Sequence, residues 1–163
     1  MASGTGQVTV RRAGREDIGR LTELLHDVLE VHAAIRPDIF IPGTVKYTTE
    51  ELEGILQDDT RPVYTAADGQ GRVVGYAFCQ LQQQPFSNTM IPFTSMFIDD
   101  LCVDPACRGQ HIGQALFEHV KAEARRLGCY EITLNVWAGN GPAERFYESM
   151  GMKTQERRME YIL

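Results

Sequence analysis

The sequence predicts one domain of mixed α/β architecture, with a mostly antiparallel sheet flanked by helices. Its 163 residues match the usual length of a single domain. Strand patterns at 63–67 and 73–81, joined by a glycine-rich turn, predict an antiparallel hairpin. Farther along, a helix pattern at 112–127 separates strand patterns at 94–103 and 131–137, and a helix crossover of this kind joins parallel strands. Together these patterns predict a mixed sheet.

A strand and a long helix are expected at the start of the chain. The strand covers 8–11, and the helix follows Gly14, a residue suited to a helix cap. The helix must end by Arg36, because Pro37 disfavours the helical conformation in the residue before it. The apolar side chains at helical spacing, which predict one buried face, are Ile18, Leu21, Leu25, Val28 and Leu29.

A second helix is expected from Thr48 to about Gln57. Thr48 is followed three residues later by Glu51, which is the spacing of a capping box. The residues between the two helices, 38–46, contain proline and glycine and are expected to form a loop.

The remaining elements follow from periodicity and turn residues. Gly128 is expected to end the helix that precedes it. After the hairpin we expect a polar linker at 82–92, a strand at 94–103, a helix at 112–127, a strand at 131–137, a helix at 143–150 and a last strand at 152–162.

The composition excludes several classes of protein. About a quarter of the residues are Leu, Ile, Val or Phe, so the chain is not expected to be disordered. The net charge of −6 is opposite to the basic balance typical of nucleic-acid binding, and no apolar stretch approaches the length of a membrane span. Residues 1–7 are small and polar, so they predict a flexible tail rather than a secretion signal. Four cysteines without a Cys-x-x-Cys pair predict reduced thiols in a cytoplasmic protein.

The segment 101–116 carries the strongest chemical signal. A strand ends in Asp104-Pro105, and Arg108, Gly109 and Gly113 lead directly into a helix. Free amides at the helix start and a guanidinium favour an anion the size of a pyrophosphate, seated at 108–114. The alternative is an ordinary strand-to-helix loop. The spacing fits neither a nucleotide P-loop nor a dinucleotide fingerprint.

A second motif lies downstream, from Asn140 to Gly151, and reads Asn-x-x-Ala-x-x-Phe-Tyr-x-x-x-Gly. Together with Arg-x-x-x-x-Gly-x-Ala from Arg108, it makes the chain resemble the GNAT superfamily of N-acetyltransferases, most strongly over 101–151. That family usually has glycine where this chain has His111, and His tolerates unusual backbone angles better than most residues.

The resemblance implies that acetyl-CoA is bound by residues 94–151. It lies in a V between two parallel strands that splay apart, here 96–103 and 131–137. Backbone groups of the splayed strand hold the pantetheine arm, and the loop before the helix holds the pyrophosphate. Asn140 is implied to contact the pantetheine arm, with a plain helix N-cap as its alternative. The residues expected to bind the cofactor are Leu101, Cys102, Val103, Arg108, Gly109, Gln110, His111, Ile112, Gly113, Gln114, Asn140, Ala143 and Phe146.

Three residues are candidates for catalysis. By resemblance Tyr147 protonates the departing thiolate, and the alternative is a core aromatic beside Phe146. Asp99 is the first candidate for the general base and Asp100 the second. Alternation places Asp99 with Leu101 on one face of the strand and Asp100 with Cys102 on the other. The alternative is that the two aspartates bind a cationic substrate without moving protons.

The acceptor is expected to be a small cationic amine that attacks the thioester directly in a ternary complex. The resemblance leaves open a protein lysine or N-terminal amine as acceptor, and a non-catalytic acyl-CoA-binding module is the alternative to an enzyme. Residues 17–60 and 82–93 are expected to wall the acceptor site, with His32, Phe40 and Asp99 as contacts.

No metal and no nucleic-acid or membrane partner is expected. Cys102, Cys107 and His111 are spaced suggestively for zinc, but a closed site needs four ligands. The resemblance also allows a homodimer formed through the last strand.

Overall fold

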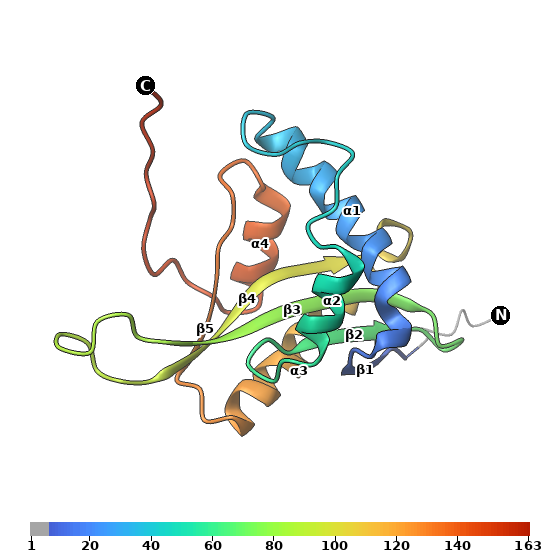
Figure 1. Cartoon of the computed structure of the whole chain (residues 1–163), viewed down its shortest axis with the longest axis horizontal. Helices are drawn as coiled ribbons and strands as arrows, with labels where there is room; N and C mark the ends of the chain where they lie inside the picture. The colour runs from blue at the N-terminus through green and yellow to red at the C-terminus, as the bar shows by residue number, and fades with distance from the viewer. Residues whose placement is uncertain (1–6) are drawn as a thin grey trace.

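A five-stranded mixed sheet forms the centre of the computed structural model, which describes residues 7–163 (Figure 1). Residues 1–6, most of the expected flexible tail, lie outside the described residues. The strands follow one another across the sheet in chain order: the first four are antiparallel neighbours, and the last pair is parallel. The predicted mixed, mostly antiparallel sheet is therefore confirmed. The strands are β1 (Thr9–Arg12), β2 (Val63–Ala67), β3 (Val73–Gln83), β4 (Thr94–Val103) and β5 (Glu131–Leu134).

Helices cover both faces of this sheet. Helix α1 (Ile18–Ile35) and the shorter α2 (Thr49–Leu56) lie on one face, α3 (Ile112–Arg126) lies on the other, and α4 (Gly141–Ser149) follows β5 (Figure 1). Two short 3-10 helices, η1 (Arg15–Asp17) and η2 (Pro105–Cys107), precede α1 and α3. Over residues 7–163, none of the helices has the length and apolar character needed to cross a bilayer.

Each face of the sheet carries its own core. The helical spacing read from the sequence places Leu21 and Leu25 of α1 against the sheet, where they are almost fully buried, whereas Val28 and Leu29 farther along the helix are partly buried. The core under α1 and α2 includes Leu21, Leu24, Leu25, Leu52, Tyr76, Phe78 and Cys102. The core under α3 includes Ala77, Cys79, Met96, Ile98, Ile112, Leu116 and Val120.

Local signals placed the helix ends well. Thr48 and Glu51 form the expected capping box, with Glu51 N donating to Thr48 Oγ1 over 3.1 Å. Gly128 takes a φ of +74° after α3, a conformation that suits glycine. Strand β5 ends at Leu134, earlier than expected, because its pairing with β4 ends there, and α4 begins at Gly141, behind its cap Asn140.

The predicted last strand at 152–162 is wrong. This segment runs as extended chain away from the sheet, and beyond Met152 it makes no backbone-to-backbone hydrogen bond within residues 7–163 (Figure 1). Its polar links are made by side chains: Gln155 donates to Glu131 over 3.0 Å, and Arg36 donates twice to Glu160, over 2.6 and 3.1 Å. Thr154, Tyr161 and Ile162 suit a strand, but five residues of the segment are charged, and a strand also requires a neighbour with a free edge.

Gly75 and Gly54 provide a matched test of the packing between the sheet and α3. An alanine Cβ at Gly75 would lie 2.9 Å from the carbonyl oxygen of Cys102 and 3.1 Å from Leu116 Cδ1, so Gly75→Ala should lower the free energy of unfolding by about 1–3 kcal/mol. Gly54 lies exposed within α2 with nothing within 4 Å of its added Cβ, so Gly54→Ala should raise it by about 0.5–1 kcal/mol. Urea denaturation measures both, and equal stability of the two variants would contradict this packing.

Candidate active site

The pairing between strands β4 and β5 ends halfway along β4. Their parallel pairing runs from Ser95 opposite Glu131 to Ile98 opposite Leu134. Beyond Ile98, β4 continues to Val103 paired only with β3. Within residues 7–163, no strand pairs with this half of β4 on its β5 side. The geometry is that of the splayed pair.

The amides of the free half of β4 alternate in direction. Asp104 N donates to Val74 O of β3 over 2.8 Å, so the amides of Val103 and Leu101 point to the opposite, open side. An extended ligand can therefore pair with Leu101 and Val103 as a further strand would. The side chain of Cys102 is buried under α1, where its Sγ lies 3.8 Å from Leu24 O, so Cys102 faces the core rather than the opening.

The loop from η2 into α3 is held by unusual backbone conformations. Gly109 has a φ of +81°, and His111 caps α3 at a φ of +60° and is the one non-glycine residue between 7 and 163 with positive φ. His111 thus adopts the left-handed conformation, which histidine tolerates better than most residues. Arg108, Gly109, Gln110, His111 and Gln114 are exposed, whereas Ile112 is a core residue that can offer a ligand only its backbone.

The two sequence motifs meet where α3 packs on α4. A Cβ at Gly113 would lie 3.2 Å from Phe146 Cζ and 3.7 Å from Val103 Cγ2, so only a residue without a side chain fits without shifting the Phe146 ring. At the start of α4, Ala143 N donates to Asn140 Oδ1 over 3.4 Å. Asn140 is therefore a helix cap in this structure, which was its alternative role.

Tyr147 is half-buried between α4, α3 and the sheet. Its ring packs against Phe146 at 5.1 Å and Phe117 at 6.5 Å between centroids. Burial raises the pKa of the phenol, and the nearby negative charge of Asp100 raises it further. The hydroxyl is therefore protonated at neutral pH and able to donate.

A β-bulge changes the faces of β4 from those expected. Cys79 pairs with Ile98 and Phe78 with Asp100, so Asp99 is an extra residue in the ladder. Ile98 therefore shares the α3 face with Leu101, and Asp100 shares the α1 face with Cys102. The expected placement of Asp99 with Leu101 is wrong: Asp99 and Asp100 both bond side chains on the α1–α2 side.

Asp100 accepts a hydrogen bond of 2.8 Å from the hydroxyl of Tyr76, a fully buried residue of β3. Burial raises the pKa of Asp100 to about 6, although the Tyr76 bond and the charge of Lys46 both favour the carboxylate. A carboxyl group with this pKa can take up and release a proton near neutral pH. Sequence reasoning missed Tyr76. The available signal was a tyrosine within a buried strand, because a buried phenol usually finds a hydrogen-bond partner.

Asp99 is already bound to a cation. Lys46 Nζ donates to Asp99 Oδ2 over 2.6 Å, and the Tyr47 hydroxyl donates to the same oxygen over 3.3 Å. Burial lowers the pKa of Lys46, but the bond to Asp99 outweighs it and the net pKa is raised. Sequence reasoning did not single out Lys46, which lies 53 residues away from Asp99 at the end of the predicted loop.

A depression opens beside this ion pair. It has a volume of about 340 Å³ and is lined by Lys46, Tyr47, Glu50, Glu51, Gly54, Ile55 and Arg61. Most of this lining comes from α2 and the loop before it, within the expected acceptor wall at 17–60.

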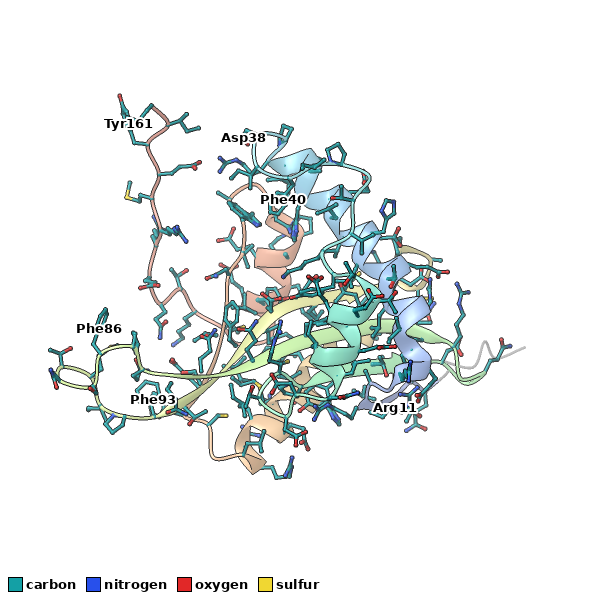
Figure 2. The ribbon with its side chains drawn as sticks, viewed as in Figure 1. Arg11, Asp38, Phe40, Phe86, Phe93 and Tyr161 are labelled. Carbon is teal, nitrogen blue, oxygen red and sulfur yellow. The ribbon has the colours of Figure 1, made fainter. Side chains whose placement is uncertain are left out.

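His32 and Phe40 come together at the far end of α1. Their rings lie 5.3 Å apart, Phe40 meets Trp137 edge-on at 5.5 Å, and Arg36 lies over the Trp137 ring. Burial lowers the pKa of His32, and the charge of Lys46 lowers it further, so this imidazole favours the neutral form. The other expected wall projects from the sheet as the loop between β3 and β4, with Phe86 66% exposed (Figures 1 and 2).

The zinc-like spacing of Cys102, Cys107 and His111 does not produce a metal cluster. Between residues 7 and 163, no group of three or more His, Cys, Asp or Glu side chains is arranged to hold a metal ion.

The family model and the similar proteins of known function all point to the same family. The model described as the acetyltransferase (GNAT) family matches residues 25–152. A glucosamine 6-phosphate N-acetyltransferase of Trypanosoma brucei brucei is 34% identical over 93 residues, which are 57% of this chain and 59% of that protein. A peptidyl-lysine N-acetyltransferase, YjaB, of Salmonella typhimurium is 32% identical over 109 residues, 66% of this chain and 62% of that protein. The chain thus spans about three fifths of the length of these relatives.

Solved structures resemble the whole chain. A mutant of the BH1408 protein from Bacillus halodurans has a TM-score of 0.90 and 30% identity, covering 95% of this chain and 99% of that one. The aminoglycoside N-acetyltransferase AAC(6')-Iy, solved in complex with CoA, has a TM-score of 0.72 and 16% identity, covering 100% of this chain and 99% of that one. The second likeness concerns the fold alone.

Proposed function

Because the chain belongs to the GNAT family of acetyltransferases, we propose that it transfers an acetyl group from acetyl-CoA to the primary amine of a small cationic molecule. One observation carries this proposal: the open half of β4 presents free amides on one side and two carboxylates on the α1–α2 face of the sheet. A place for a thioester and a place for an amine therefore adjoin.

The residues around the splay fit acetyl-CoA. The outward amides of Leu101 and Val103 suit the pantetheine arm, whose amide groups can pair as a strand does. Exposed Arg108 and the first turn of α3 suit the pyrophosphate, since free helix amides and a guanidinium both bind phosphate oxygens. The thioester supplies an activated acetyl group.

The acceptor loses a proton, its nitrogen attacks the acetyl carbonyl carbon, and the carbon–sulfur bond breaks as the carbon–nitrogen bond forms. We assign proton removal to Asp100, directly or through water, because its pKa of about 6 leaves it ionised at neutral pH. The amide of Leu101 is the donor that stabilises the developing oxyanion. Burial raises the pKa of Tyr147, so its proton passes to the sulfur in concert with cleavage of the carbon–sulfur bond, and Tyr147 regains a proton from the acetylated amine or from water.

Asp99 takes the binding role instead. Its carboxylate already holds the ammonium of Lys46, so the pair of aspartates recognises cationic amines. The relatives act on a sugar amine and on peptidyl lysine, so a sugar amine and a protein lysine remain alternative acceptors. A non-catalytic acyl-CoA-binding module is the alternative outside enzymes.

Tyr147→Phe tests the reaction itself. The variant should lower turnover by on the order of 10²-fold with little change in acetyl-CoA affinity, because it removes the proton donor and leaves the ring. Calorimetry measures the binding, and thiol release over a panel of amines measures turnover. Tyr130→Phe is the control, since Tyr130 is 74% exposed and packs on Phe93.

Unchanged turnover in Tyr147→Phe would remove Tyr147 from the mechanism. Binding of acetyl-CoA without turnover on any amine would favour the acyl-CoA-binding module, and failure to bind any CoA ester would overturn both functions.

The pH dependence of the rate separates the two aspartates. Activity should rise with pH through about 6 as Asp100 ionises, and Asp100→Asn should abolish this acid limb. Asp99→Asn should keep the limb and raise KM for a cationic amine. Tyr76→Phe removes a hydrogen bond to the charged form, so the pKa of Asp100 should rise and the limb should move to higher pH.

Tyr64→Phe is the control for Tyr76→Phe, because Tyr64 is also a buried strand tyrosine but packs on His119 on the other face. An acid limb that survives in Asp100→Asn and vanishes in Asp99→Asn would reverse the assignment.

We also propose a homodimer, in which the tail at 153–163 of one copy pairs with β5 of the other. The outer edge of β5 has no strand partner among residues 7–163, and the tail exposes large apolar side chains along its last residues. These side chains, from 73% exposed to fully exposed, are Met159, Tyr161, Ile162 and Leu163.

Deleting residues 153–163 should convert the dimer into a monomer with an unchanged far-ultraviolet spectrum, as measured by light scattering and circular dichroism. Ile41→Ser is the control, since Ile41 is 71% exposed but lies on the loop after α1. A full chain that is monomeric at millimolar concentration would contradict the dimer, as would a truncated chain that still dimerises.

A further inference from the structure

Lys46 places a primary amine of the protein inside its own candidate acceptor site. The residue lies at the end of the loop between α1 and α2, lines the depression beside α2, and holds its Nζ 5.3 Å from the centre of the Tyr47 ring. Its Nζ is bonded to Asp99, and its charge also acts on Asp100. In the part of the chain that the structure describes, neither Lys121 nor Lys153 forms a hydrogen bond or salt bridge with these aspartates.

The acceptor amine needs the same position. Under the proposed function a cationic amine enters as an ammonium, is held by Asp99 and gives up a proton beside Asp100. Lys46 satisfies the first of these requirements within the protein itself. The Lys46 side chain has a flexible four-carbon stem and is 43% exposed. Its nitrogen can therefore move within the site without unfolding the core.

We propose that Lys46 is an internal acceptor, which competes with external amines for Asp99 and becomes acetylated when acetyl-CoA is present without them. The inference rests on the proposed function. The ammonium of Lys46 loses a proton to Asp100 or to water, Nζ bonds to the acetyl carbon, and the carbon–sulfur bond breaks. Tyr147 protonates the departing thiolate to give free CoA thiol, and the second proton on Nζ restores the Tyr147 hydroxyl. The product amide carries no charge, so it releases Asp99 from its ion pair.

The chain offers two internal controls, because it contains three lysines. Lys121 lies on α3 and is bonded to Glu118, and Lys153 is exposed at the start of the tail. Chemical acetylation without catalysis has no reason to favour Lys46, whose proton is held more firmly by Asp99.

The experiment is a time course of the full chain with acetyl-CoA and no amine, followed by peptide mass spectrometry. Lys46 should be acetylated on the order of 10²-fold faster than Lys121 and Lys153, at a rate independent of protein concentration. Tyr147→Phe should slow acetylation at Lys46 and leave the other two lysines unaffected. Equal rates at the three lysines, or a Lys46 rate that Tyr147→Phe leaves unchanged, would overturn self-acetylation.

A pair of substitutions tests the competition. Lys46→Met removes the charge and the amine, so KM for a cationic amine should fall severalfold, whereas Lys46→Arg keeps the charge and should leave KM near the wild-type value. A KM that rises in Lys46→Met would overturn the competition. If external amines are acetylated but Lys46 is not, this inference fails alone, and if no amine is acetylated the proposed function fails with it.

Discussion

The geometry of the site depends on how β4 is paired. Along one edge, β4 is hydrogen-bonded to β3 over its whole length, whereas on the other edge it is paired with β5 only from Ser95 to Ile98. A free strand edge is a hazard for a protein, because its amides bind any extended chain. Here the ladder to β3, interrupted only by the bulge at Asp99, holds the free half in place and leaves the amides of Leu101 and Val103 on its open side. The bulge at Asp99 falls where the pairing with β5 ends and brings a second carboxylate to the α1–α2 face of the sheet.

Salt bridges hold the parts around β4 in place. Asp104, at the end of the strand, accepts from Ala106 N over 2.9 Å and is bonded to Arg20 of α1, whose Nε also donates to Val73 O over 2.9 Å. This link fixes α1 to the end of the strand at which the loop to α3 begins. Truncating one partner of such a half-buried pair leaves the other charge without compensation, which costs more than the pair contributes.

Features encoded within a few residues could be predicted from the sequence. The capping box of Thr48 and Glu51, the end of α3 at Gly128 and the left-handed His111 all depend on local backbone chemistry. The bulge could not be predicted, because it is a property of the register between β3 and β4 rather than of either strand. The contact between Lys46 and Asp99 could not be predicted either, because these residues lie 53 positions apart in the chain. Nor could the course of the tail be predicted, because its residue types do not say whether a neighbouring strand is free to pair with it.

Arg36 connects two parts of the molecule that are far apart in the chain. Its guanidinium is shared among Asp38 of the loop after α1, Glu160 of the tail and the face of Trp137. A guanidinium has a fixed number of N–H donors. If the tail moves and Glu160 dissociates from Arg36, the donors that bound Glu160 become available to the loop beside Phe40. The position of the tail and the conformation of the loop after α1 are therefore thermodynamically linked. Linkage is reciprocal: whatever ligand orders that loop also changes the free energy of moving the tail, by the same amount.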